Sequence, residues 1–197
     1  MVLNIIISLI LSASVLSCAV TPALANNWYA PETASDWMVF AAGMSGAVAA
    51  HELGHIVVAK SDGYSIQHDG LSITYSPATF RTRKEHLRVA SAGFQGQWLA
   101  SEAAFALGGS DSYLAKGIIC GHLATTLAYA AVLRKHSLGD TVGISKSSGI
   151  NVNQVAALVS LPALLDAWRL FGQDVPRWVP GLSFALKGAG ISAAWMF

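Results

Sequence analysis

Five long apolar segments constrain the fold of this 197-residue chain more than any other feature. They comprise residues 37–59, 89–107, 113–133, 152–171 and 179–197. Each is close to the roughly 20 residues that an α-helix needs to cross a bilayer. The chain is 53% hydrophobic and only 12% charged, whereas soluble domains usually contain about 25% charged residues. We therefore expect an all-α, polytopic membrane protein with about five transmembrane segments.

The N-terminal region predicts a targeting segment. Residues 2–20 are apolar, and Ala23-Leu24-Ala25 matches the small-residue pattern at which signal peptides are cleaved. Residues 1–25 are thus expected to be a signal peptide or, alternatively, a first transmembrane helix. Residues 26–197 would then form a single membrane-embedded domain. The expected location is a multi-pass position in the inner (cytoplasmic) membrane of a bacterium.

Basic residues gather in two of the connections between the apolar segments. These are Lys60, Arg81, Arg83, Lys84 and Arg88 in the first connection and Arg134, Lys135 and Lys146 in the third. The positive-inside rule places both connections in the cytoplasm. The net charge of +1, without a basic patch, argues against a nucleic-acid partner.

A small β-hairpin is predicted in the first connection. Residues 64–68 and 71–75 alternate apolar and polar side chains, and Asp69-Gly70 between them is a common two-residue turn. Such a hairpin either stiffens the loop or offers an edge to which an extended peptide pairs.

The sequence His51-Glu52-Leu53-Gly54-His55 is an HExxH motif inside the first apolar segment. On a helix, residues four apart share one face, so both imidazoles can bind one metal ion. Glu52 can then serve as the general base for a water held by that metal. Because ionisable groups at membrane depth are costly, a chance match is a poor explanation. We predict that His51 and His55 are metal ligands and that Glu52 is catalytic.

A catalytic zinc site usually has three protein ligands, so a third must come from elsewhere. Asp166 is the candidate, because it is the only carboxylate in the fourth apolar segment; Glu102 in the second segment is the alternative. Asp166 can instead pair with Arg169, three residues further along a helix. Straight helices would leave Asp166 about 10 Å from the histidines in depth. A break at Pro162, a later start of the helix in the fourth segment, or a partly unwound stretch of that helix would close this separation.

These motifs resemble the site-2 protease family of intramembrane zinc metalloproteases. That family has HExxH in a transmembrane helix and a later element similar to Leu165-Asp166-Ala167-Trp168-Arg169, with Pro162 upstream. Between them, an Ala-Gly element opens the helix after the hairpin, and residues 92–97 (AGFQGQ) match its Ala and Gly. Gln97 stands where the family commonly has Asn. The resemblance covers about residues 37–171.

The resemblance implies peptide-bond hydrolysis of transmembrane protein or peptide substrates, within or near the bilayer. One zinc ion would be held by His51, His55 and Asp166, and Glu52 would transfer a proton from water to the leaving amine. Gln97 would donate to the substrate carbonyl or, equally, form a plain hydrogen bond between helices. Regulation would come from a separate protein. The alternative function is a catalytically silent membrane scaffold that retains the protease fold.

Overall fold

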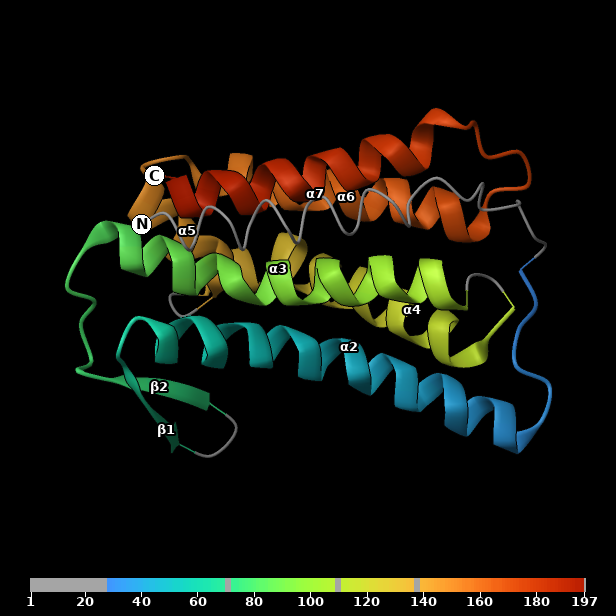
Figure 1. Ribbon diagram of the computed structural model, residues 1–197, viewed down its shortest axis with the longest axis horizontal. Coiled ribbons are helices and arrows are strands. Elements are labelled where there is room, and N and C mark those ends of the chain that lie inside the picture. The colour runs from blue at the N-terminus through green and yellow to red at the C-terminus, as the bar shows by residue number, and fades with distance from the viewer. Residues whose placement is uncertain (1–27, 70–71, 109–110, 137–138, 197) are drawn as a thin grey trace.

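The computed structural model describes residues 28–196, apart from 70–71, 109–110 and 137–138. Its helices run side by side along the long axis of the molecule, and a two-stranded hairpin lies beside the C-terminal end of α2 (Figure 1). The elements in chain order are α2 (Ala34–Ser61), β1 (Ser65–Asp69), β2 (Ser72–Ser76), α3 (Arg83–Leu107), α4 (Tyr113–Leu127), a π-helical turn η1 (Ala128–Val132), a 3-10 turn η2 (Leu133–Lys135), α5 (Asp140–Ser148), α6 (Val152–Phe171) and α7 (Trp178–Met196).

Local sequence signals fix where several helices begin and end. Thr33 caps α2 in a reciprocal arrangement with Asp36, in which each side chain bonds the other's backbone N–H. Asn151 begins α6 by accepting a hydrogen bond from the Asn153 N–H. Gly149, with φ of 81°, ends α5 in the left-handed conformation that glycine adopts without steric cost.

Glycines bring α2 unusually close to its two neighbours. A Cβ atom on Gly43 would lie 2.3 Å from the Leu114 carbonyl oxygen of α4. One on Gly54 would lie 2.2 Å from the Ala92 carbonyl oxygen of α3. Such distances exclude any larger residue, so these glycines allow direct contact between helix backbones. The middle of α2 is therefore enclosed between α3 and α4.

The predicted hairpin is present, whereas the prediction of five transmembrane segments is wrong. Strands β1 and β2 pair antiparallel, with Ser65 opposite Ser76 and Gln67 opposite Thr74. Within the described residues, only two helical stretches are long and apolar enough to cross a membrane, Tyr113–Val132 and Val152–Phe171, and both are partly buried. The predicted targeting segment, residues 1–25, lies outside the described residues.

Polar residues explain why two of the predicted segments do not qualify as transmembrane helices. The expected segment 89–107 contains Glu102, two glutamines and two serines, and the helix that includes it begins in the basic stretch at Arg83. The segment 179–197 contains Lys187, three glycines and a proline. Both are helices of the right length, but their polar residues make them too hydrophilic. What the sequence encodes is a compact, mostly helical domain with a small β-hairpin.

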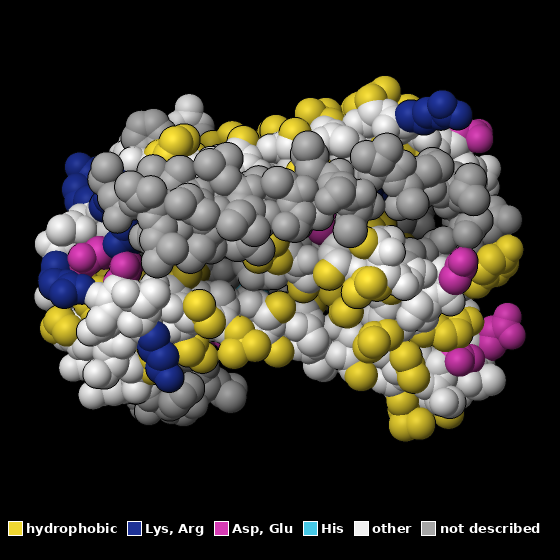
Figure 2. Space-filling model, viewed as in Figure 1, with side chains coloured by type: hydrophobic (Ala, Val, Ile, Leu, Met, Phe, Trp, Pro, Cys, Tyr) yellow, Lys and Arg dark blue, Asp and Glu magenta, His cyan; other side chains and the backbone are white. Residues whose placement is uncertain are grey.

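Apolar and charged side chains are distributed unevenly over the surface. On the face shown in Figure 2, hydrophobic side chains lie across the middle of the molecule, while Lys, Arg, Asp and Glu lie toward its two ends. Large exposed apolar side chains include Trp37, Val48, Leu99, Leu127 and Leu182. The long helices thus present apolar sides outward, and the charges on this face belong to the ends of the bundle.

Candidate metal centre

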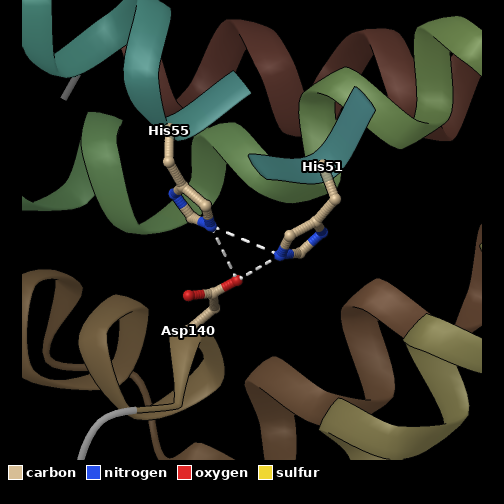
Figure 3. A group of neighbouring side chains, drawn as sticks. All are labelled: His51, His55 and Asp140. Carbon is tan, nitrogen blue, oxygen red and sulfur yellow. Dashed lines mark hydrogen bonds and ion pairs between the residues drawn. The ribbon is translucent and has the colours of Figure 1, made fainter. Parts of the chain in front are cut away.

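Three side chains from two distant parts of the chain converge on one point. The His51 and His55 Nε2 atoms lie 3.3 Å apart, and Asp140 Oδ2 lies 2.8 Å from the first and 3.1 Å from the second. Figure 3 shows the two imidazoles extending from α2 and the carboxylate reaching them from the start of α5. Both histidines are buried, and the Asp140 side chain is 13% exposed. These three residues, which we call the metal group, could hold a metal ion.

Helix geometry and a close approach of the chain explain the convergence. His51 and His55 are four residues apart on α2, so their side chains lie on one face. Asp140 is the first residue of α5, where a carboxylate interacts favourably with the helix dipole. Gly139 precedes it, and a Cβ atom there would lie 2.5 Å from the Leu133 carbonyl oxygen. The tight path before Asp140 therefore requires glycine.

The other ring nitrogen of each histidine has its own partner. His55 Nδ1 lies 2.7 Å from the Val89 carbonyl oxygen, which can only accept, so this nitrogen carries the proton. His51 Nδ1 lies 3.0 Å from the Gln97 Oε1 atom, which likewise accepts. In the neutral rings, both Nε2 atoms therefore direct lone pairs at the Asp140 carboxylate and at each other. A cation among the three atoms would remove that repulsion.

The spacing of the three atoms fits a small tetrahedral cation. Zinc bonds of about 2.0–2.1 Å at tetrahedral angles place neighbouring ligand atoms about 3.3 Å apart. Two of the three distances, 3.3 and 3.1 Å, are close to this value, and the third, 2.8 Å between His51 Nε2 and Asp140 Oδ2, is shorter. Space for the ion depends on Gly93 of α3. A Cβ atom on Gly93 would lie 2.4 Å from His51 Nε2 and 2.5 Å from His55 Nε2. The donor set, its spacing and this cleared space all suit a metal ion.

Charge and aromatic packing hold the Asp140 side of the site. Burial alone would raise the pKa of Asp140, but the two imidazoles beside it lower that pKa to about 2. The Tyr129 ring stacks on His51 with a centroid distance of 5.1 Å, and Phe94 packs edge-on against both rings. Tyr129 belongs to the π-helical turn η1, and such turns are frequent at functional sites.

Glu52 and the hairpin lie next to the same group. Burial raises the pKa of the Tyr75 hydroxyl on β2, and the negative charges of Asp140 and Glu52 raise it further. Glu52 follows His51 directly on α2 and is itself partly exposed.

The structure does not bring Asp166 or Glu102 to the histidines. Both carboxylates belong to a separate buried ion cluster, which we define as Glu102, Asp166, Arg169 and Lys187. Arg169 lies 2.6 Å from Glu102 and 3.0 Å from Asp166, and Lys187 bonds both carboxylates. The alternative pairing of Asp166 with Arg169, three residues apart on a helix, is thus observed, and Asp140 takes the position predicted for Asp166.

The depth difference explains why Asp166 stays away from the histidines. His51 and His55 lie ten and six residues before Ser61, the last residue of α2, or about 15 and 9 Å at 1.5 Å per residue. Asp166 lies fourteen residues into α6, about 21 Å from its beginning at the same end of the bundle. Because α6 continues as a helix through Pro162, no break closes this separation.

One sequence signal could have identified Asp140. The two basic connections are predicted to lie on one side of the molecule, and HELGH lies in the part of its helix nearest that side. A carboxylate in the third connection is therefore expected to lie closer in depth to His51 and His55 than Asp166 does. Gly139-Asp140 stands in that connection, where a glycine before an acidic residue is typical of a helix start.

The comparisons with known proteins add no family to this geometry. The chain matched no protein-family model, no curated protein and no solved structure.

A matched pair of aspartate substitutions tests the third ligand. Asp140→Asn should weaken metal binding by more than the roughly 10–100-fold that loss of a residue supporting a ligand costs, because the charged ligand itself is lost. Asp166→Asn should weaken metal binding far less than Asp140→Asn does, since Asp166 lies in the ion cluster and contacts neither His51 nor His55. Metal content and dissociation constants of the purified, folded variants decide this. Metal retained in Asp140→Asn but lost in Asp166→Asn would contradict the assignment.

The space cleared by Gly93 can be tested with a second glycine on the same helix. Gly93→Ala should abolish metal binding, because its methyl group would lie against both Nε2 atoms. Gly96→Ala is the control, since its methyl group would crowd the Ala50 carbonyl oxygen of the same neighbouring helix without meeting either ring. Equal loss of metal in both variants would show that the effect comes from helix packing alone.

Proposed function

We propose that this protein is a zinc metalloprotease that hydrolyses peptide bonds of membrane-protein substrates within or near the bilayer. The observation that carries the proposal is the buried group of His51, His55 and Asp140, with a glutamate directly following the first histidine. Two imidazoles and one carboxylate are a known ligand set of catalytic zinc sites that keep a fourth position open. A site serving structure alone would have no need of Glu52.

Each residue has a distinct part in this proposal. When bound, zinc would lower the pKa of a water molecule and polarise the scissile carbonyl. His51, His55 and Asp140 would hold the ion. Glu52 would accept a proton from the attacking water and deliver it to the leaving amine nitrogen, since a partly exposed carboxylate beside the ligands can reach both.

The HExxH motif supports the proposed function more strongly than the wider resemblance to site-2 proteases does. In that family, the later Leu-Asp element implies a ligand, whereas in this chain Asp166 lies in the ion cluster. The carboxylate comes instead from Asp140, before the fourth apolar segment. The similarity therefore supports the class of reaction, and the ligand set is proposed from this chain's own geometry.

The hairpin supports an extended peptide as the substrate. It consists of only two strands, so each strand has an edge without a partner strand among the described residues. The hairpin follows the end of α2, the helix that carries both histidines. A peptide pairing along such an edge would be held with its backbone extended, as proteolysis requires.

The arrangement of α6 supports a bilayer as the surroundings. Its buried face carries Asp166 and Arg169, while its exposed side chains are large and apolar. The exposed set recurs every three or four residues along one face: Leu158, Leu161, Leu164, Trp168 and Phe171. Polar groups inside and apolar groups outside are the pattern expected of a helix that contacts lipid. We propose an integral membrane location on this basis.

The proposed chemistry is tested at Glu52. Glu52→Gln should retain zinc at full occupancy and lose cleavage of a membrane-protein substrate by at least about 100-fold, because the amide keeps the volume but cannot accept the proton. Cleavage in proteoliposomes and zinc content are measured together. Unchanged cleavage would contradict the proposal. A wild-type protein that binds zinc but cleaves nothing would favour the silent scaffold.

The proposed location is tested by fractionation. The full-length protein should remain in the membrane pellet after an alkaline carbonate wash and should need detergent for extraction, because the apolar face of α6 would otherwise contact water. A peripheral membrane protein that the wash releases serves as the control. Recovery of the folded protein in the soluble fraction without detergent would refute the membrane location while leaving the metal chemistry open.

A further inference from the structure

The side of His51 that faces away from the metal group contacts a buried glutamine. His51 Nδ1 lies 3.0 Å from Gln97 Oε1, and Gln97 is fully buried in α3. The other end of the same amide, Nε2, donates to Thr126 Oγ1 at 2.9 Å. Contacts at both ends therefore fix how the Gln97 amide is turned. With its oxygen toward His51, Gln97 favours the tautomer in which His51 Nε2 is free to bind a metal.

The contacts continue from Thr126 to the ion cluster. Thr126 Oγ1 lies 3.5 Å from His122 Nδ1, one turn earlier on α4. His122 Nε2 lies 3.5 Å from Asp166 Oδ2. Thr126 and His122 are both almost inaccessible to solvent. We call Gln97, Thr126 and His122 the polar chain, because together they join the metal group to the ion cluster.

The directions of donation along the polar chain agree at every step. His122 Nε2 makes no hydrogen bond in the structure, but Asp166 Oδ2, 3.5 Å away, can only accept, so it favours a proton on this nitrogen and leaves Nδ1 as an acceptor. The Thr126 hydroxyl can then donate to His122 and accept from Gln97 Nε2. This leaves the Gln97 oxygen to accept from His51 Nδ1. A single consistent set of protons thus leads from Asp166 to a metal-binding lone pair on His51.

The ion cluster fixes the position of Asp166, which lies at one end of the polar chain. Its two acidic and two basic side chains come from α3, α6 and α7, and Ser101 and Ser183 also bond Asp166. All four charges are at least nine-tenths buried. Removing one partner from such a group leaves an uncompensated charge, so its members are held firmly in place.

The two ligand histidines are supported in different ways. His55 Nδ1 is held by a backbone carbonyl, at Val89, which no side-chain substitution removes. His51 depends on Gln97. We propose that Gln97 is the positioning residue that sets the ring orientation and tautomer of His51 for metal binding, and that Thr126, His122 and the ion cluster hold Gln97 in turn. This inference rests on the proposed metal site and assigns a purpose to Asp166 other than ligation.

The test compares two buried glutamines on α3. Gln97→Leu should weaken zinc binding about 10–100-fold, as loss of a residue supporting a ligand usually does, and should shift the visible absorption bands of the cobalt-substituted protein. Gln97→Glu should restore most of the lost affinity, because a carboxylate oxygen also accepts from His51 Nδ1. Thr126→Val, which removes the contacts of the hydroxyl with the Gln97 amide nitrogen and with His122 but leaves the Gln97 oxygen beside His51, should change affinity in the same direction by less.

Gln95→Leu is the matched control. Gln95 is also buried, but it bonds Ser91 and Trp195 rather than a histidine, so its loss should leave zinc affinity and the cobalt spectrum unchanged. Equal zinc affinities for Gln97→Leu and Gln95→Leu, with unaltered cobalt spectra, would overturn the inference alone. If Gln97→Leu does not fold, an unchanged affinity and spectrum in Thr126→Val would overturn it. Absence of zinc binding by the unsubstituted protein would overturn the proposed metal site and this inference together.

Discussion

The close contact between α2 and α3 is the constraint on which the rest of the structure depends. Gly54 and Gly96 allow each helix to meet the other's backbone, since a Cβ atom at either position would lie 2.2 Å from a carbonyl oxygen. This contact places both imidazoles of α2 against α3. In this position His55 contacts the Val89 carbonyl oxygen, His51 contacts the Gln97 amide, and both Nε2 atoms face Gly93, which has no side chain. A wider separation of the helices would remove all three features together.

The ion cluster and the metal group are two buried polar groups in one small bundle, and they differ in how their charges are compensated. The ion cluster contains two positive and two negative side chains, so its charges compensate internally. When both of its imidazoles are neutral, the metal group carries only the negative charge of Asp140. Burial of an unpaired charge is costly, so loss of one partner from the ion cluster would destabilise the packing of α3, α6 and α7. In the metal group, a bound cation would compensate the charge of Asp140. The polar chain links these two environments.

The sequence predicted the parts of the site that depend on neighbouring residues. The four-residue spacing of His51 and His55 within a helix requires them to share a face, and the structure has them so. The hairpin after that helix followed from alternating side chains. The sequence predicts too many transmembrane segments, because Glu102 and Lys187 make the hydropathy of two of the predicted segments too low for a membrane span. Those charges face inward, where other helices neutralise them.

The sequence by itself determined the helices, the hairpin and the pair of histidines, because these depend on side-chain periodicity and on contacts within a few residues. Only the tertiary structure decided the third member of the metal group. Asp140 and Asp166 are both carboxylates, and the glycine that precedes Asp140 indicates a helix start but does not identify a metal ligand. Their depths in the bundle distinguish them, since α6 continues as a helix through Pro162 and α5 begins near the level of the histidines. The same packing paired Asp166 with Arg169 and Lys187, which satisfied its charge without a metal ion.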